Sequence, residues 1–246
     1  HRRGLGTGSP IVSRRFVTLA AAQMGPVARS ESRAAVVRRM IELMRQAHAM
    51  GAEVVAYPEA ALTAFFPHWF ISDDREIDSY FEREMPSTDS KPLFDEARRL
   101  KIGFHLGYCE LDYATGAKRR FNTAILVDKT GSIVGKYRKI HLPGHPDHKP
   151  QNAFQNLEKR YFETGNLGWK VWRTMGGNLG MMICNDRRWP ESYRVMGLQG
   201  VEVITLGFNT PSVNSQDNSE GPQKRIFHHK LSLQAGAYQN SAWVVA

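Results

Sequence analysis

The chain has 246 residues, of which 41% are hydrophobic and 23% are charged, and its formal net charge is +9. This length supports one α/β domain with a substantial core, and no apolar run approaches the roughly 18 residues that a membrane helix requires. An N-terminal tail without acidic residues carries four of the positive charges, at Arg2, Arg3, Arg14 and Arg15. No nucleic-acid-binding motif is recognisable in the rest of the chain. We therefore expect neither a membrane protein nor a nucleic-acid-binding protein.

The N-terminal tail also lacks the apolar segment of a secretory signal. We expect residues 1–15 to be an unstructured basic extension and residues 16–246 to form one domain. The chain has two cysteines, Cys109 and Cys184, which could pair in principle. So few cysteines in a chain of this size favour free thiols in a reducing cytoplasm, and neither has the spacing of a zinc site.

A strand–helix–strand pattern opens the domain. Residues 16–23 predict a strand, and Ser30 or Ser32 can cap the helix that follows. Apolar residues recur in that helix at spacings of three and four: Val37, Met40, Ile41, Met44 and Ala47. Residues 53–57 then predict a short buried strand. Such a βαβ unit indicates a sheet that is covered by helices.

Strands and helices continue along the rest of the chain. Further strands are expected at residues 102–110, 121–127, 133–140, 179–184, 201–206 and 242–246, and helices at 74–81, 91–100, 192–199 and 223–239. The turn at residues 128–131 predicts an antiparallel hairpin, so parallel and antiparallel pairing should be mixed. Residues 141–167 predict a long polar loop, and loops of this length are usually functional or mobile.

An aromatic cluster follows the second strand, in the segment Phe65-Phe66-Pro67-His68-Trp69-Phe70. Proline interrupts this segment, so it predicts a loop rather than a helix. The cluster could simply pack on the core, or it could form the wall of a pocket, because ligand pockets are largely apolar. Both interpretations remain open from the sequence.

The predicted strand at residues 179–184 ends at a cysteine, Cys184, and Pro190 stands where the next helix could begin. Open α/β sheets place their chemistry at the carboxyl ends of strands. Helix N-terminal amides would also favour the thiolate form of Cys184. The alternative is a structural core thiol, which is the usual role of a free cysteine.

Glu59 and Lys139 also lie at or just beyond the ends of predicted strands. Each has an ordinary explanation alone, since Glu59 could be a surface carboxylate and Lys139 one charge of a solvated basic run. Together with Cys184 they supply the groups for acyl transfer through a thioester. A thiolate attacks a carbonyl carbon, a carboxylate moves protons, and an ammonium group stabilises the oxyanion.

Three segments that contain these residues resemble the signature blocks of the nitrilase superfamily, in the same order. They are Tyr57-Pro58-Glu59, Tyr137-Arg138-Lys139-Ile140-His141-Leu142 and Ile183-Cys184-Asn185-Asp186-Arg187-Arg188-Trp189-Pro190-Glu191. The resemblance implies a four-layer αββα sandwich that uses no metal or organic cofactor. It also implies that Cys184 is the nucleophile, that Glu59 is the general base and acid, and that Lys139 stabilises the oxyanion with the backbone N–H of Asn185.

Further segments are similar to the N-carbamoyl-D-amino acid amidohydrolases within this superfamily. They are Arg119-Arg120-Phe121-Asn122-Thr123, Leu157-Glu158-Lys159-Arg160-Tyr161-Phe162-Glu163, Phe208-Asn209-Thr210-Pro211 and Gln234-Ala235-Gly236-Ala237-Tyr238-Gln239-Asn240. This resemblance implies hydrolysis of N-carbamoyl-D-amino acids to the D-amino acid, ammonia and carbon dioxide. Glu158 matches a further carboxylate that lies close to the lysine and the cysteine.

The same resemblance supplies candidate substrate-binding residues. Arg187 and Arg188 match positions that hold the α-carboxylate of the substrate, a task that suits the bidentate guanidinium group. A solvated surface patch is the ordinary alternative for such a pair. Asn209 and Thr210 match residues near the substrate. His141 could orient the catalytic groups or serve only as a structural loop histidine.

Other functions remain open from the sequence. A related amidohydrolase, acting on N-carbamoyl-β-alanine or on a simple amide, is one alternative, and a non-catalytic truncated scaffold is another. The resemblance implies a homodimer or homotetramer. It also implies core strands beyond Ala246, so we expect the sandwich to be incomplete at its C-terminal side.

Overall fold

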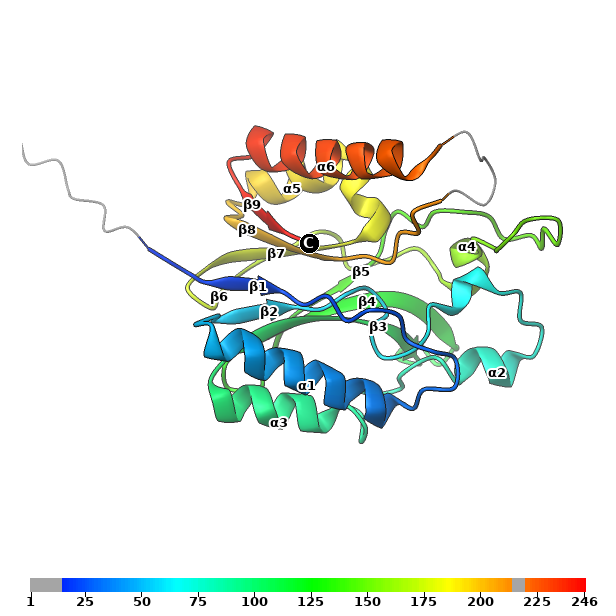
Figure 1. The fold of residues 1–246 in the computed structure, drawn as a ribbon, viewed down its shortest axis with the longest axis horizontal. Coiled ribbons are helices and arrows are strands. Elements are labelled where there is room, and N and C mark those ends of the chain that lie inside the picture. The colour runs from blue at the N-terminus through cyan, green and yellow to red at the C-terminus, as the bar shows by residue number, and fades with distance from the viewer. Residues whose placement is uncertain (1–14, 214–219) are drawn as a thin grey trace, which may run out of the picture.

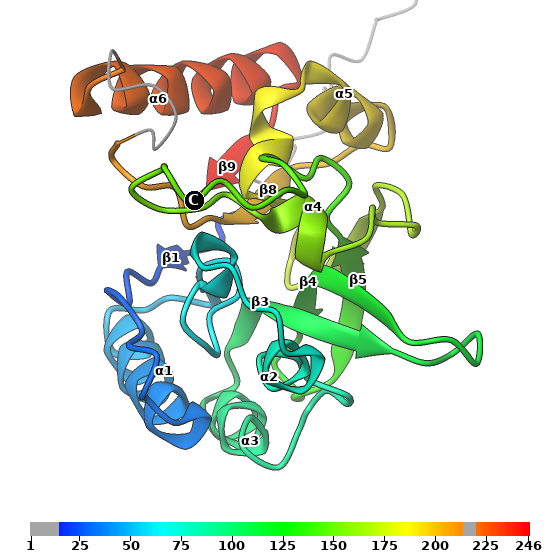
Figure 2. The same ribbon diagram turned by 90° about the vertical axis from the view of Figure 1, so that its right-hand side faces the viewer.

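The computed structural model describes residues 15–213 and 220–246 of the chain. Two β-sheets face each other, with helices on both outer faces (Figures 1 and 2). Helices α1 and α3 cover the first sheet, and α5 and α6 cover the second. The αββα sandwich expected from the sequence is therefore confirmed.

The first sheet has the strand order β1-β2-β3-β4-β5 and the second has the order β6-β7-β8-β9. The strands are β1 (Leu19–Ala21), β2 (Val54–Ala56), β3 (Gly103–Asp112), β4 (Arg119–Val127), β5 (Ile133–Arg138), β6 (Val171–Thr174), β7 (Gly177–Ile183), β8 (Val203–Gly207) and β9 (Trp243–Val245). The α-helices are α1 (Arg33–Ala49), α2 (Asp74–Asp78), α3 (Lys91–Leu100), α4 (Glu158–Tyr161), α5 (Pro190–Leu198) and α6 (Pro222–Gln239), and two 3₁₀ helices are η1 (Phe66–His68) and η2 (Cys184–Arg188). None of the helices in the described parts of the chain is long and apolar enough to span a membrane.

Pairing within the sheets brings four strand ends to one edge of the sandwich. β2 runs parallel to β3, whereas β4 and β5 continue the first sheet antiparallel, as the hairpin pattern predicted. In the second sheet, β7 runs parallel to β8, with Ile183 opposite Gly207. As a result, the segments after β2, β5, β7 and β8 emerge together, and Glu59, Lys139, Cys184 and Asn209 lie within these segments.

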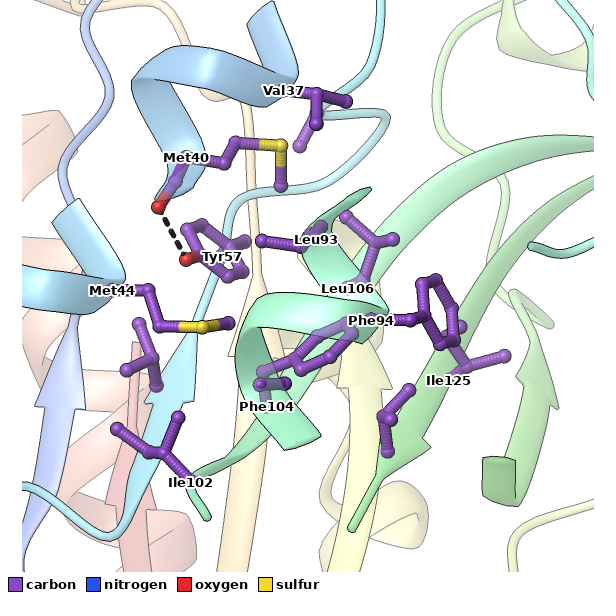
Figure 3. Packing of buried hydrophobic residues seen from close by; sticks show 14 of the residues in the cluster. Val37, Met40, Met44, Tyr57, Leu93, Phe94, Ile102, Phe104, Leu106 and Ile125 are labelled. Atoms are coloured by element: carbon purple, nitrogen blue, oxygen red, sulfur yellow. Dashed lines mark hydrogen bonds between the residues drawn. The ribbon is translucent and has the colours of Figure 1, made fainter. Parts of the chain in front are cut away.

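The core between α1, α3 and the first sheet follows the periodicity of the sequence. Met40 and Met44 of α1 are fully buried and pack with Leu93 and Phe104 (Figure 3). The Tyr57 hydroxyl donates a 2.7 Å hydrogen bond to the carbonyl of Met40 and so satisfies a buried polar group. This bond ties the segment that leads to Glu59 to helix α1.

Local structure differs from the sequence-based expectations at several points. β1 has three residues rather than eight, and β6 and the single-turn α4 were not predicted at all. Elements this short carry too few residues for a periodic pattern, so tertiary packing decides them. Cys184 does not end a strand; it is the first residue of η2 and has a positive φ of 48°.

Two glycines allow both sheets to pack closely against the backbone at Pro58 and Glu59. A Cβ atom on Gly207 of β8 would lie 2.5 Å from the backbone nitrogen of Glu59. A Cβ atom on Gly107 of β3 would lie 2.8 Å from the Cα of Glu59. Only glycine permits this approach from either side, so the backbone of Glu59 is held between the sheets.

We predict that Gly207→Ala lowers the free energy of unfolding by about 1–3 kcal/mol, because the added methyl group overpacks a rigid backbone contact. Urea unfolding measures this difference. Gly177→Ala is the control, since the nearest atom there is the flexible carboxylate of Glu202 at 3.3 Å. The control should lose less than about 0.5 kcal/mol. Equal losses in the two variants would contradict the proposed constraint.

Candidate active site

Lys139 lies at the centre of the site, between two carboxylates. Its Nζ is 2.7 Å from Oε1 of Glu59 and 2.6 Å from Oε2 of Glu158. Lys139 and Glu59 are fully buried, and Glu158 is almost fully buried. Lys139 follows β5, Glu59 follows β2 and Glu158 begins α4, so residues 59, 139 and 158 meet only in the folded chain.

Burial alone would lower the pKa of the Lys139 ammonium group. The negative charges that Cys184, Glu158 and Glu59 can carry outweigh burial and raise its pKa above the ordinary value. Lys139 is therefore a permanent cation at neutral pH. A permanent ammonium group is suited to stabilising an anion that develops nearby.

The carboxylate of Glu59 is oriented by neutral donors as well as by Lys139. The side-chain amide of Asn122 donates to Oε1 at 2.8 Å, and the backbone N–H of Asn209 donates to Oε2 at 3.0 Å. The Asn209 side chain also donates to the backbone carbonyl of Glu59. A buried carboxylate with such partners keeps a fixed orientation.

Glu158 has a different electrostatic environment. Burial raises the pKa of its carboxyl group, the charge of Lys139 opposes this, and the charge of Glu59 adds to it; the net result is a pKa of about 7. Two carboxylates that share one ammonium group titrate as a coupled set. Protonation near Glu158 can therefore change around neutral pH.

The Cys184 thiol is held beside a guanidinium group and a hydroxyl group. Its Sγ lies 3.7 Å from Nη1 of Arg187 and 3.7 Å from Oγ1 of Thr210. Burial raises the pKa of the Cys184 thiol, the charge of Glu59 raises it further, and Lys139 and Arg187 oppose both effects. Burial thus outweighs any contribution of helix amides to the thiolate form, so the net shift is opposite to the one that the helix terminus alone would give. A base must therefore remove the proton when the thiol reacts.

Such a base is within reach. One ligand atom each from Glu59, Glu158 and Cys184 lie within 4.8 Å of one another. These three groups could in principle hold a metal ion. The Lys139 ammonium group already bonds to both carboxylates, and its positive charge disfavours a second cation. The arrangement fits proton transfer from sulfur to carboxylate better than metal binding.

Asp186 links the segment of Lys139 to the segment of Cys184. Its buried carboxylate accepts hydrogen bonds from the Tyr137 hydroxyl at 2.7 Å and from the backbone N–H of Ile183 at 3.0 Å. The backbone N–H and Nδ1 of His141 lie on the same carboxylate, each at 3.0 Å. Tyr137 and His141 flank Lys139, and Ile183 precedes Cys184, so one side chain fixes the two segments relative to each other. No sequence pattern predicts this role of Asp186, although the residue stands within the third block.

The imidazole of His141 stacks between Trp169 and Trp189, with ring centroids 5.5 and 5.0 Å apart. The ring nitrogen Nδ1 of His141 is directed at Asp186. His141 is not among the residues that line the cavity around Cys184. The structure thus brings His141 next to the site but outside the cavity. Orientation of the catalytic loop remains the role predicted for it.

A cavity of about 180 Å³, the catalytic cavity, opens onto Cys184. Most of the predicted site residues line it: Glu158, Cys184, Asn185, Arg187, Arg188, Asn209 and Thr210. Glu59 and Lys139 lie behind this lining. Arg225, Phe65 and His68 also line the cavity. No sequence pattern predicted Arg225 as a site residue. Phe65 and His68 belong to the aromatic cluster, so this cluster forms part of the pocket wall.

Arg187 is buried in the wall of the catalytic cavity, with 1% of its surface exposed. It donates to Thr210 Oγ1 at 2.9 Å and to the carbonyl of Cys184, and its Nε has no partner. Within the described residues neither Arg187 nor the more exposed Arg188 forms an ion pair with a carboxylate. Burial of a cation without a counter-ion is unfavourable in free energy. The positive charge in this wall of the cavity therefore favours the binding of an anion.

An αββα sandwich with a cysteine, a lysine and two carboxylates at one edge defines the class of protein. A model of the carbon-nitrogen hydrolase family matches residues 18–246. The chain therefore belongs to the carbon-nitrogen hydrolase family.

Relatives within this class have several substrates. The chain is 30% identical over 206 residues to N-carbamoylputrescine amidase of Arabidopsis thaliana, covering 83% of this chain and 62% of that protein. It is 28% identical to citrullinase of Francisella tularensis, over 65% of this chain and half of the relative. A carbon-nitrogen hydrolase of Helicobacter pylori G27 has a similar fold, with a TM-score of 0.74 at 24% identity, over 94% of this chain and 74% of that one. The match thus spans less than two thirds of several curated relatives.

We predict that the Glu158 carboxyl group contributes stability that is lost as pH rises from about 4.5 through 7. The pKa of Glu158 is higher in the folded state than in the unfolded chain, so the folded state holds the proton more tightly between about 4.5 and 7. Its stabilising contribution is complete below the unfolded pKa and is lost as pH rises through the folded pKa, with a change of about 3 kcal/mol. Urea unfolding at several pH values measures it. Since His105 and His229, whose pKa values burial lowers to about 4, give wild type and Glu158→Gln the same opposite pH dependence, the contribution of Glu158 is the difference between the two proteins. A difference that does not change with pH would refute the shifted pKa.

We also predict that Asp186→Asn lowers the free energy of unfolding by about 1–3 kcal/mol, because an amide nitrogen cannot accept the hydrogen bonds that the carboxylate accepts. Asp112→Asn is the matched control, since the Asp112 carboxylate is partly exposed and bonds to Arg138. Its loss should stay below about 1 kcal/mol. Similar losses in both variants would show that Asp186 is not a structural link.

Proposed function

We propose that this chain hydrolyses N-carbamoyl-D-amino acids to the D-amino acid, ammonia and carbon dioxide, through a thioester on Cys184. The observation that carries this proposal is the buried guanidinium group of Arg187, which lies beside the cysteine and forms no ion pair with a carboxylate of residues 15–213 or 220–246. A substrate carboxylate at Arg187 and Arg188 would supply the missing anion. The family membership supports the reaction type.

The electrostatics of the catalytic cavity also favour this substrate over N-carbamoylputrescine, the substrate in the name of one relative. Putrescine carries an ammonium group, which would meet the positive charges of Arg187 and Arg188. Arg225 also lines the cavity and is paired with Glu220 at 2.9 Å. Among the described residues of the lining, Glu158 is the acidic one, and its carboxylate is bound to the Lys139 ammonium group. An anionic substrate tail therefore fits better than a cationic one.

In the first half of the proposed reaction, Glu59 takes the proton from the Cys184 thiol as sulfur attacks the carbamoyl carbon. The negative charge moves to the carbamoyl oxygen. Lys139 stabilises this oxygen together with the backbone N–H of Asn185, since the first N–H groups of a helix such as η2 lack intrahelical partners. The bond from carbon to the terminal nitrogen then breaks, and Glu59 returns its proton to that nitrogen, which leaves as ammonia.

In the second half, a water molecule attacks the thioester carbon and gives a proton to Glu59. The carbon–sulfur bond breaks, and the thiolate recovers the proton. The product is an N-carboxy amino acid, which decomposes to carbon dioxide and the free amino acid. Glu158 holds Lys139 in position through both halves, because its carboxylate bonds to the ammonium group at 2.6 Å.

The preference for the D-enantiomer is supported by the similarity of the sequence segments to N-carbamoyl-D-amino acid amidohydrolases. Two anchoring groups are available to distinguish enantiomers: the arginine pair for the carboxylate and Cys184 for the carbamoyl carbon. With both ends held, exchange of the hydrogen and the side chain at the α-carbon changes which wall the side chain meets.

We predict that the protein releases ammonia from N-carbamoyl-D-alanine at least tenfold faster than from the L-enantiomer or from N-carbamoylputrescine, measured as kcat/KM. Cys184→Ala should abolish ammonia release while the substrate still binds, because only the attacking sulfur is lost. An ammonia assay with isothermal titration of the variant measures both properties.

Faster release from N-carbamoyl-β-alanine or from a neutral amide would assign a related amidohydrolase instead. No release from any of these compounds by cooperatively folded protein would favour the scaffold alternative. Turnover that survives in Cys184→Ala would refute the nucleophile.

A further inference from the structure

A second cavity of about 260 Å³ adjoins the catalytic cavity. We call it the rear cavity. Its wall is largely apolar and includes Met24, Pro26 and Val27 from the segment after β1, Pro58 and Ala61 from the segment after β2, and Trp69. Glu59 also lines it, so the rear cavity lies beside the proposed base.

Three residues line both cavities and therefore form the partition between them: Phe65, His68 and Asn209. Asn209 is fixed by its two hydrogen bonds to Glu59. Phe65 packs against the core cluster that contains Phe66 and Tyr161. These two residues hold their positions through bonds and packing that do not involve the cavities.

His68 is attached differently. It ends the short helix η1, and its backbone carbonyl accepts a hydrogen bond from the N–H of Gln155 at 2.9 Å. Its imidazole contacts the rings of Phe65 and Phe154 edge-on, at centroid distances of 5.0 Å each. No hydrogen bond to the imidazole is formed within the described residues. The imidazole ring therefore lies in the wall between the two cavities. It is held by the backbone of His68 and by edge contacts with the two phenylalanine rings.

The side chain of His68 is uncharged at neutral pH, which is compatible with the apolar wall of the rear cavity. Burial lowers the pKa of its imidazole below the ordinary value, and the charge of Glu59 only partly opposes this. At neutral pH the ring is uncharged, so it adds no positive charge to those of the arginines.

We infer that His68 is a specificity-determining residue, which limits the size of the substrate side chain by closing the catalytic cavity to the apolar rear cavity. This inference rests on the proposed function, since it assumes a substrate whose carboxylate and carbamoyl group are anchored at Arg187 and Cys184. The side chain at the α-carbon then meets the rest of the lining, to which His68 belongs. Removing the imidazole joins the two cavities and opens an apolar space of about 260 Å³ to a larger side chain.

The kinetic test compares wild type with His68→Ala, using N-carbamoyl-D-alanine and N-carbamoyl-D-phenylalanine. The expected result is a rise of at least about tenfold in the ratio of kcat/KM for the phenylalanine compound over the alanine compound, in line with the discrimination that apolar pockets achieve. His68→Phe keeps an aromatic ring of similar size and should keep the wild-type ratio. Val213→Ala enlarges the catalytic cavity away from the partition, and its ratio should change less than about threefold.

A second measurement separates this inference from the proposed function. The rates at which iodoacetamide and the bulkier N-benzyl iodoacetamide alkylate Cys184 are followed by peptide mass spectrometry, which needs no substrate. His68→Ala should raise the rate of the bulky reagent relative to the small one at least about tenfold, and His68→Phe should not. If wild type hydrolyses no N-carbamoyl amino acid, the proposed function fails. The ratio of the two alkylation rates still tests whether His68 separates the two cavities.

Thermal unfolding verifies that each variant is folded. An unchanged alkylation ratio in folded His68→Ala overturns the inference, whatever the substrate. An equal rise in Val213→Ala or His68→Phe also overturns it, because general loosening of the cavity would then explain the effect.

Discussion

The ion triad of Glu59, Lys139 and Glu158 is the constraint on which the rest of the site depends. Three charged groups are almost completely removed from water, and each would be costly alone. Close geometry and the amide donors of Asn122 and Asn209 compensate for the lost hydration. The triad is formed by residues from the segments after β2 and β5 and from α4. Its stability is therefore coupled to correct assembly of the sandwich.

Cys184 is positioned by a different set of contacts. The residue has a left-handed backbone conformation, which is unfavourable for a side chain with a Cβ atom and is maintained by its surroundings. Asp186 provides much of that support, because its carboxylate binds the N–H of Ile183 on one side and the Tyr137–His141 segment on the other. The thiol and the ammonium group are thereby set relative to each other by a residue that touches neither.

Electrostatics divide the site into two functional parts. Around Lys139 two carboxylates share one ammonium group, which favours proton transfer among groups whose positions do not change. Around Arg187 a positive charge remains uncompensated within the described residues, which favours an anionic ligand. In the proposed reaction, this separation would let the same cavity bind a substrate carboxylate at one end of the molecule and protonate the leaving nitrogen at the other.

Much of this could be predicted from the sequence. The apolar periodicity of Val37, Met40 and Met44 predicted α1, and Ser32 does cap it with a side-chain hydrogen bond to Ala35. The ordered blocks around Glu59, Lys139 and Cys184 predicted the family and the fold, because residue types and their order along the chain are sequence properties. The strand at Gly177–Ile183 was likewise predicted by its apolar run.

Only the tertiary structure decided the rest. Asp186 became a link because Tyr137 and His141, more than 40 residues away in the sequence, direct their donors to the carboxylate that also binds the N–H of Ile183. No local pattern encodes that convergence. The pKa of Cys184 is raised rather than lowered because burial depends on the whole fold and outweighs the local helix terminus. His68 became a partition for the same reason: whether an aromatic segment packs in the core or divides two cavities depends on which distant segments surround it. The sequence by itself determined the reactive groups and their order, and the packing of the two sheets decided their distances, their charge states and the shape of the space between them.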